Sequence, residues 1–255
     1  MDFRLDFAAT IIGVSEPNRP SPLDAMASVG YVYDNRPITT KVYQMTLENG
    51  DPLNDVANYY SDKLQAHGNR AAGVDWNGEA GQNLRFSQLL KVVDPTAPYS
   101  IGDIGCGYGA LVDYLRTLNH DFQYTGIDIS EQMVSAANAR FENQQNFRFL
   151  VGNSLAEPSD YCVASGIFNV RLERSDEDWL SSIIQTIEKM NVSSRKGFAF
   201  NCLTSYSDSE KKRSYLYYAD PLGLFDICKR RFSRNVALLH DYGLYEFTII
   251  VRKDL

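Results

Sequence analysis

Three glycines stand at alternate positions in the stretch SIGDIGCGYGALVDYL, which covers residues 100–115. Gly105, Gly107 and Gly109 lie between an apolar run typical of a β-strand and a run typical of a helix. A glycine turn at the end of a strand lets the backbone approach a ligand closely and presents free N–H groups at the helix start. We therefore expect a nucleotide-type cradle here, although a tight turn that binds nothing has the same pattern.

Two acidic residues near this turn indicate the kind of ligand. Asp103 precedes Gly105 by two positions, so alternation along the strand would point its carboxylate toward the ligand. A carboxylate suits a cationic ammonium or sulfonium group and repels a pyrophosphate. Asp128 ends the next predicted strand, in YTGIDIS, where a carboxylate can accept both hydroxyls of a ribose. These two carboxylates fit the groups of S-adenosylmethionine better than those of NAD.

The elements that must position these residues alternate along the chain. The predicted strands are YSIGDIG, FQYTGIDI, FRFLVG, DYCVASGIF and KGFAFNCL, and the helices between and after them are ALVDYLRTL, SEQMVSAANARFE, DEDWLSSIIQTIEKM and DPLGLFDICKRRF. This alternation predicts a mainly parallel sheet with helices on both faces. The chain then ends on VALLHDY and EFTIIVRK, two strands that a short turn joins into an antiparallel pair.

The N-terminal part of the chain has a different character. SEPNRPSPLD is rich in turn residues, and two β-like runs flank DNRP, which predicts a hairpin or an extended arm. The pattern becomes helical from DPLNDVANYYSDKL onward. We expect an N-terminal extension over residues 1–54, which could serve as a homodimer contact, and one α/β domain over residues 55–255.

Composition restricts the partners. A net charge of −7 and a pI near 5.0 argue against a protein that binds nucleic acid by neutralising phosphates. No run of apolar residues is long enough for a membrane helix, and MDFRLDFAATIIGV does not read as a signal peptide, so we expect a cytoplasmic protein without a membrane partner. Cys106, Cys162, Cys202 and Cys228 are widely spaced and the chain has three histidines, so no metal site or disulfide framework is expected.

DIGCGYG, followed by GIDIS, FLVGNSL and ASGIF, resembles the motifs of the class I, Rossmann-like S-adenosylmethionine-dependent methyltransferases. The resemblance covers roughly residues 55–255. It implies an α/β fold with a seven-stranded, doubly wound, mainly parallel sheet that ends in an antiparallel strand pair. It also implies S-adenosyl-L-methionine as the cofactor.

The resemblance assigns cofactor-binding roles near the glycine turn. The backbone of Gly105, Cys106 and Gly107 would line the methionine part of the cofactor. Asp103 would lie near its ammonium group, directly or through water, and Asp128 would hold the ribose.

Further cofactor roles fall on the loops after the second, third and fourth strands. Ile129 and Met133 would sandwich the adenine, although ordinary helix packing would also explain Met133. Asn153 and Ser154 occupy the loop where the family often has an aspartate that accepts from the adenine amino group, and an asparagine carbonyl oxygen can do the same. Ser165 should lie beside the cofactor.

Two more residues before the motif are candidates for the cofactor site. Arg85 could pair bidentately with the cofactor carboxylate, or it could form a plain surface salt bridge. Trp76, in GVDWN, could be a lid over the site or a core aromatic residue.

The methyl acceptor should bind near the carboxyl ends of the fourth and fifth strands, because in-line transfer requires a nucleophile close to the sulfonium carbon. Asn169 and Arg171, in SGIFNVRL, could face it. Adenine or glutamine N-methyltransferases would show a D/N-P-P-Y type tetrapeptide where this chain has SGIF, so methylation of the amino groups of DNA bases is disfavoured. His240 is the candidate general base, with a structural histidine as the alternative.

The insertion over residues 204–220 is rich in tyrosine and charge and could close over the acceptor. The substrate-binding candidates in it are Tyr206, Tyr217, Tyr218 and Asp220. Each could instead be a core or capping residue, and Asp220 before Pro221 resembles a helix N-cap.

Together these features predict a methyltransferase that acts on an oxygen or nitrogen atom of a small molecule, with oxygen preferred. One alternative is a catalytically silent, methyltransferase-like binding or regulatory protein, because no clear catalytic acid or base is evident. Another is an NAD-linked oxidoreductase, which Gly105, Gly107 and Ala110 allow and Asp103 disfavours.

Overall fold

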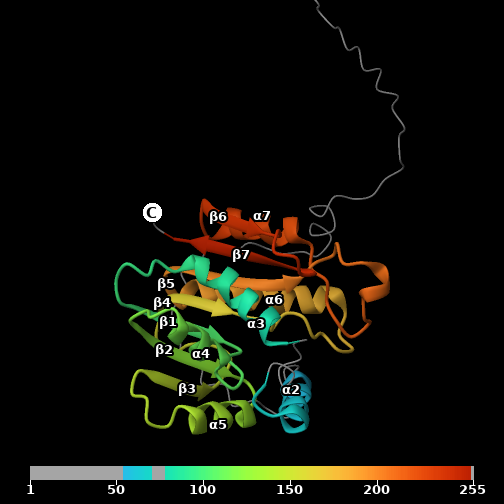
Figure 1. Ribbon diagram of the computed structural model, residues 1–255. Helices are drawn as coiled ribbons and strands as arrows, with labels where there is room; N and C mark the ends of the chain where they lie inside the picture. The colour runs from blue at the N-terminus through green and yellow to red at the C-terminus, as the bar shows by residue number, and fades with distance from the viewer. Residues whose placement is uncertain (1–53, 71–77, 254–255) are drawn as a thin grey trace, which may run out of the picture. The chain divides into compact units, whose positions relative to one another are not determined.

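The computed structural model describes residues 54–70 and 78–253. The predicted N-terminal hairpin or arm lies outside these residues. Within them the chain forms one seven-stranded sheet flanked by helices (Figure 1).

The strands are β1 (Tyr99–Ile104), β2 (Phe122–Asp128), β3 (Phe147–Val151), β4 (Ser159–Ala164), β5 (Ser194–Leu203), β6 (Asn235–Leu239) and β7 (Glu246–Arg252). The helices are α2 (Asn54–His67), α3 (Glu79–Leu89), α4 (Ala110–Thr117), α5 (Glu131–Arg140), α6 (Asp176–Val192) and α7 (Pro221–Arg231), with short 3-10 turns η2 (Leu90–Val92) and η3 (Ser209–Lys211).

The strand order is β3-β2-β1-β4-β5-β7-β6. Neighbouring strands from β3 to β5 pair in parallel, whereas β7 runs antiparallel between β5 and β6. The predicted doubly wound sheet with an antiparallel C-terminal pair is therefore confirmed. Because β7 alone among these strands is reversed, the carboxyl ends of the others meet at one edge of the sheet. Ligands of open α/β sheets bind at this edge.

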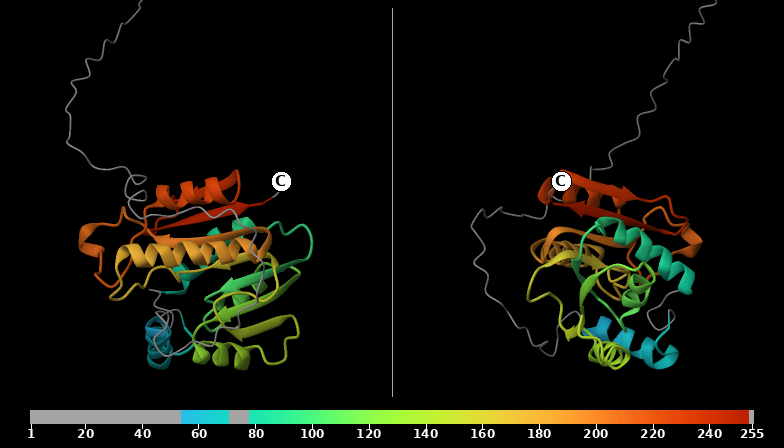
Figure 2. Two further views of the ribbon diagram at one scale, coloured as in Figure 1. Left: turned by 180° about the vertical axis from the view of Figure 1, so that it is seen from behind. Right: turned by 60° about the vertical axis from the view of Figure 1, so that its left-hand side comes forward.

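Two apolar clusters fill the two faces of the sheet. On one face, Ile101 and Tyr124 pack with Leu89 of α3 and Leu115 of α4. On the other face, Ile127, Cys162 and Phe198 pack with Ile183 of α6 and Leu224 of α7. Figures 1 and 2 show α3 and α4 on the first face and α6 and α7 on the second. Alternation along each strand sends successive side chains to opposite clusters, so both faces are buried.

Helix α6 is fixed at its start and along one side by its sequence. The Ser175 side chain caps it by accepting from the Asp178 N–H at 3.1 Å. Acidic residues occupy its first turn, where their negative charge interacts favourably with the positive end of the helix dipole. Its buried residues recur at helical spacing and are Trp179, Ile183, Ile187 and Met190. This side of α6 therefore packs on the sheet.

The connection from β3 to β4 is short and contains no helix, over residues 152–158. Leu150 and Val151, at the end of β3, remain about half exposed. Of these two, Leu150 is the register partner of Ile127 and so lies on the α6 side of the sheet, and Gly152 and Asn153 of the connection line the candidate site. In the described parts of the chain, no helix is long and apolar enough to cross a membrane.

Candidate functional site

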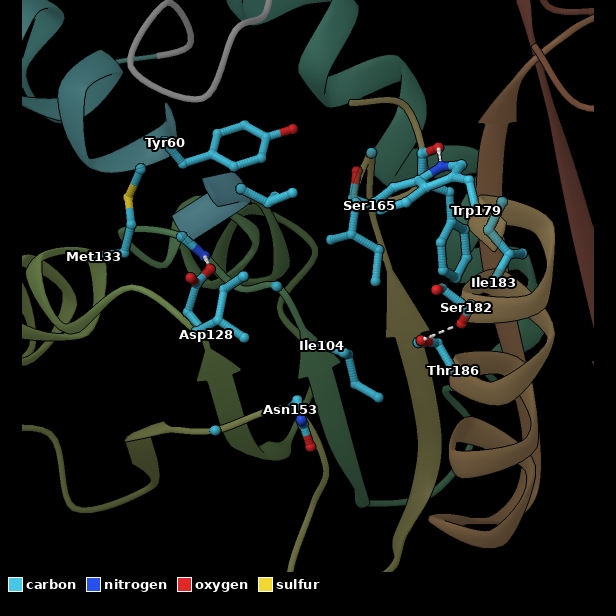
Figure 3. A pocket seen from close by; sticks show the side chains of 18 residues that line it. Tyr60, Ile104, Asp128, Met133, Asn153, Ser165, Trp179, Ser182, Ile183 and Thr186 are labelled. Carbon is cyan, nitrogen blue, oxygen red and sulfur yellow. Dashed lines mark hydrogen bonds between the residues drawn. The ribbon is translucent and has the colours of Figure 1, made fainter. Parts of the chain in front are cut away.

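A pocket lies at the carboxyl edge of β1 to β4, between α2 and α6 (Figure 3). Its empty space, open mouth included, is about 920 Å³. Its lining is mostly apolar. The residues are Val56, Tyr60, Ile104, Gly105, Gly107, Asp128, Ile129, Met133, Gly152, Asn153, Ser165, Gly166, Ile167, Phe168, Trp179, Ser182, Ile183 and Thr186.

The glycine turn between β1 and α4 forms part of the pocket wall. Gly105, Gly107 and Gly109 have φ values of 73°, 53° and 83°, which L-residues with a side chain rarely adopt. A Cβ on Gly105 would lie 2.1 Å from the Ile167 side chain, so the turn and the segment after β4 are in direct contact. Glycine is therefore required at this position for both conformation and space.

Four N–H groups of this turn already have partners within the chain. Those of Gly105 and Cys106 donate to the Ile127 carbonyl at 2.8 and 3.0 Å. The Gly107 N–H donates to the Asp128 carboxylate, and the Gly109 N–H to the Cys106 carbonyl. Three of these donors hold the turn against the end of β2 and the fourth closes the turn itself, so these four are not free to bind a phosphate. The turn therefore contributes shape to the site, as a cofactor without phosphates requires.

Asp128 presents a fixed carboxylate to the pocket. Its Oδ2 accepts from the Gly107 N–H and its Oδ1 from the Ser130 N–H, both at 2.9 Å. Burial raises the pKa of this carboxyl group above its ordinary value, and the backbone N–H groups of Ser130, Gly107 and Ile129 counteract that rise. Each carboxylate oxygen can accept a further hydrogen bond. Asp128 can therefore receive two hydroxyl groups, as the sequence predicts.

Asp103 lies behind the pocket wall and outside the lining. Since Ile104 points into the pocket, the preceding side chain points to the other face of the sheet. There the Tyr124 hydroxyl donates to its Oδ2 at 2.6 Å, while its buried Oδ1 has no hydrogen-bond partner among the described residues. Burial raises the pKa of Asp103 to about 7.

Apolar side chains form the other walls. Ile129 and Met133, both predicted for adenine, line the pocket from the start of α5. Trp179 lies opposite on α6, and its indole N–H donates to the Phe168 carbonyl at 2.8 Å. Sequence reasoning missed α2 and α6 as pocket walls, because Val56 and Trp179 have the spacing of ordinary core residues. Only the missing helix after β3 would have revealed them.

The loop after β3 brings Asn153 into the pocket lining, where its Oδ1 accepts from Lys189 at 3.2 Å. Ser154 is exposed next to it and does not line the pocket. Ser165, directly after β4, lines the pocket with a buried hydroxyl oxygen that has no hydrogen-bond partner among the described residues.

Arg85 has a different partner from the one expected. Its Nε and Nη2 donate to both carboxylate oxygens of Glu246 at 2.6 to 2.9 Å. Glu246 is 1% exposed, so this ion pair is buried rather than superficial. Arg85 does not line the pocket. The position expected for a cofactor carboxylate is thus filled by a carboxylate of the chain itself.

Asn169 and Arg171, the two acceptor-binding candidates after β4, make hydrogen bonds and an ion pair within the protein. The Asn169 Oδ1 accepts from the Leu203 N–H at 3.0 Å, which ties this segment to β5. Arg171 pairs with Asp176 at 3.1 Å and donates to the Arg174 carbonyl. Neither residue lines the pocket.

The candidates in the insertion also lie away from the pocket lining. Tyr206 is exposed, whereas Tyr217 is buried. The Tyr218 hydroxyl accepts from the Arg213 N–H at 2.9 Å. Asp220 caps α7 by accepting from the Leu222 N–H at 3.0 Å, which is the structural alternative considered for it.

His240 follows β6 and therefore lies at the same edge of the sheet as the pocket, but at a distance from it along that edge. Its exposed ring lies 5.9 Å from the Tyr206 ring and 6.0 Å from the Phe247 ring, between centroids. Three strand spacings, roughly 14 Å, separate β6 from β4. The structure thus keeps His240 out of the pocket.

Trp76 lies outside the described residues. The structure describes all four cysteines, each buried and outside a disulfide. No group of histidine, cysteine, aspartate and glutamate within residues 54–70 and 78–253 could hold a metal ion.

Comparisons with known proteins point in one direction. A family model described as a methyltransferase domain matches residues 103–188, from the glycine turn into α6. A protein of Mycobacterium tuberculosis whose name assigns it to the methyltransferases is 57% identical over 164 residues, which are 64% of this chain and 99% of that protein.

Two solved structures share the fold. The N-methyltransferase NodS of Bradyrhizobium japonicum, in complex with S-adenosylhomocysteine, aligns with a TM-score of 0.57 and 16% identity over 78% of this chain and 98% of its own. The magnesium protoporphyrin IX methyltransferase of Synechocystis, with bound S-adenosylhomocysteine, aligns with a TM-score of 0.55 and 14% identity over 79% and 99%.

Proposed function

Because the chain belongs to the class I S-adenosylmethionine-dependent methyltransferases, we propose that it transfers a methyl group to an oxygen or nitrogen atom of a small molecule. S-adenosylmethionine is the cofactor of this reaction. The acceptor and its reacting atom are the proposed part.

The Asp128 carboxylate is the observation that carries the assignment of the cofactor to this pocket. Both of its oxygens are held by backbone N–H groups at a pocket wall and can still accept hydroxyl groups, as a ribose diol requires. The walls on either side are apolar and suit a flat adenine ring. The turn beside Asp128 uses its own N–H donors internally, which disfavours a dinucleotide with its pyrophosphate.

We assign the cofactor contacts accordingly. Asp128 holds the ribose, Ile129 and Met133 flank the adenine, and Asn153 accepts from the adenine amino group through the oxygen that now accepts from Lys189. Gly105 and Gly107 allow close approach of the methionine part. When bound, the cofactor would supply an electrophilic methyl group on a sulfonium sulfur: the acceptor lone pair would form the new bond to the methyl carbon in line with the carbon–sulfur bond that breaks, and S-adenosylhomocysteine would be the leaving group.

The chain's own contribution to transfer is positioning and the exclusion of water. Trp179, Phe168 and Ile183 make the far wall of the pocket apolar. Asp128 is the one acidic side chain in the described lining, and we assign it to the ribose, so no carboxylate of that lining is left to act as a general base. We therefore favour acceptors that reach the site with a free lone pair, such as a carboxylate, an acidic hydroxyl or a neutral amine. His240 stays a candidate base only for an acceptor long enough to reach the end of β6.

A transfer assay tests the proposal. The protein with methyl-labelled S-adenosylmethionine is incubated with panels of small hydroxyl, carboxylate and amine compounds, and S-adenosylhomocysteine release is measured. We expect release that depends on one class of small acceptor, with the label recovered on its oxygen or nitrogen. Transfer only to protein or nucleic acid, or label recovered on carbon, would contradict the proposal.

A further inference from the structure

A chain of buried polar groups connects three distant segments to the pocket wall. Arg85 on α3 donates to Glu246 at the start of β7, and Asn201 on β5 donates its Nδ2 to Glu246 Oε2 at 2.5 Å. The Oδ1 of Asn201 accepts from the Gly166 N–H at 2.8 Å. Gly166 is a pocket-lining residue.

Asn201 can serve this chain in one orientation only. Its side chain is fully buried, so both ends of its amide must find partners within the protein. A carboxylate accepts and does not donate, and a backbone N–H donates and does not accept. The Asn201 amide therefore has its nitrogen toward Glu246 and its oxygen toward Gly166, and as long as Glu246 is present neither a carboxylate nor an apolar group can replace it.

The Gly166 N–H belongs to a turn that shapes the pocket. Gly166 has a φ of 76°, and its neighbours on both sides line the pocket. The Ile167 side chain packs against Gly105 and fills the place where a Cβ on Gly105 would lie. Ser165 has a buried hydroxyl oxygen without a hydrogen-bond partner among the described residues, which is costly unless a ligand provides one. Figure 3 shows Ser165 between the Asp128 side and the Trp179 side of the pocket.

We propose that Asn201 is a positioning residue for the bound cofactor: anchored by the Arg85–Glu246 pair, it holds the turn at Gly166 so that the Ser165 hydroxyl hydrogen-bonds S-adenosylmethionine. The inference rests on the proposed cofactor site. It gives a role to Arg85 that differs from direct cofactor binding, and it brings in Asn201 and Glu246, which do not line the pocket.

Calorimetric titration of S-adenosylmethionine and S-adenosylhomocysteine into variants of the full chain tests this role. We expect Ser165→Ala to weaken binding roughly three- to tenfold, the effect of one lost hydrogen bond. We expect Asn201→Asp to weaken it at least as much, because a carboxylate at position 201 faces the Glu246 carboxylate. In the Ser165→Ala background, Asn201→Asp should add less than twofold if Asn201 acts through Ser165. Fully additive losses would overturn the proposal.

A second substitution separates positioning from simple damage to the core. The double variant Asn201→Asp/Glu246→Gln exchanges the donor and the acceptor between the two positions. The new carboxylate at position 201 can accept from the Gly166 N–H and from the new amide at position 246, and the net charge of the cluster is that of the wild type. This double variant should regain most of the affinity that Asn201→Asp loses. Recovery of the melting temperature without recovery of affinity would show a merely structural role and overturn the proposal.

Two controls complete the experiment. Asn146→Asp makes the same chemical change at an exposed site before β3. Ser181→Ala removes a hydroxyl on α6 that donates to the Glu177 carbonyl and lies outside the pocket lining. Both should bind like the wild type. If the wild type itself binds neither ligand, the cofactor assignment fails and the inference with it. If the wild type binds and Asn201→Asp binds equally well, the inference alone fails.

Discussion

At the scale of single residues, Gly105 shows how one position can serve conformation and packing at once. The spacing of the glycines predicts its positive φ, whereas its contact with Ile167 joins residues far apart in the sequence. The sequence predicts that a glycine is needed at the turn. It cannot predict that the segment after β4 lies against it, because that contact depends on the packing of the whole sheet.

Gly105→Ala should therefore be strongly destabilising. A methyl group at this position meets Ile167 and forces a φ that alanine avoids, so we expect a loss of about 2–4 kcal/mol in the free energy of unfolding. Urea denaturation measures it. Gly243→Ala is the matched control, since Gly243 has a φ of 72° and no atom near its missing Cβ. Equal losses for the two variants would contradict the packing explanation.

Asp103 predicts a pH dependence of stability. Burial raises its pKa from 3.8 to about 7, so the folded state holds its proton more tightly than the unfolded state. The stability that this group contributes is fully present below the lower value and is lost as the pH rises to the higher one. Asp103→Asn stays neutral and keeps an acceptor for the Tyr124 hydroxyl.

The comparison of these two proteins isolates Asp103 from the other titrating groups. From pH 4 to pH 7, the free energy of unfolding of the wild type should fall relative to that of Asp103→Asn, as measured by denaturation at each pH. A difference between the two proteins that stays constant over this range would show that Asp103 titrates normally.

At the scale of elements, the sequence predicts β1 to β5 and α4 to α7 well because each has a clear signal. Buried parallel strands read as apolar runs, and α6 and α7 begin at side-chain caps. The pocket walls were harder to predict. Val56 on α2 and Trp179 on α6 have the pattern of core residues, and both are buried in the core cluster as well as lining the pocket.

Substitutions of Asp220 can distinguish a role in capping α7 from a role in binding the acceptor. Its carboxylate accepts from the Leu222 N–H at the start of α7, so Asp220→Ala should lower the free energy of unfolding by about 1 kcal/mol. Binding of S-adenosylmethionine should not change. Asp220→Asn keeps the cap and should restore stability. If Asp220→Asn is as stable as the wild type but loses methyl transfer to an identified acceptor, Asp220 contacts that acceptor.

At the scale of the whole molecule, the sheet gathers residues that the sequence separates widely. The Arg85–Glu246 pair spans 161 positions, and Asn201 connects it to the turn after β4. Asp128, Ile129 and Met133 could be predicted for the site because they follow one strand directly. Arg85 could not be placed correctly, since its partner is visible only when β7 is paired beside β5.

Binding of a ligand at the cofactor site should also raise the stability of the whole protein. A ligand that binds only the folded state stabilises it in proportion to the logarithm of its concentration relative to its Kd. Excess S-adenosylhomocysteine should therefore raise the melting temperature of the wild type, and the effect should be smaller for Asp128→Ala.

Calorimetric titration of S-adenosylmethionine into the wild type, Asp128→Ala and Asp121→Ala tests the cofactor site most directly. Asp121 is an exposed aspartate before β2, at the opposite edge of the sheet. We expect one site in the wild type, an unchanged Kd in Asp121→Ala, and a Kd raised roughly 10- to 100-fold in Asp128→Ala, because the ribose hydroxyls lose their acceptors. Wild-type affinity in Asp128→Ala, or no binding by the wild type, would contradict the assignment of this pocket to the cofactor.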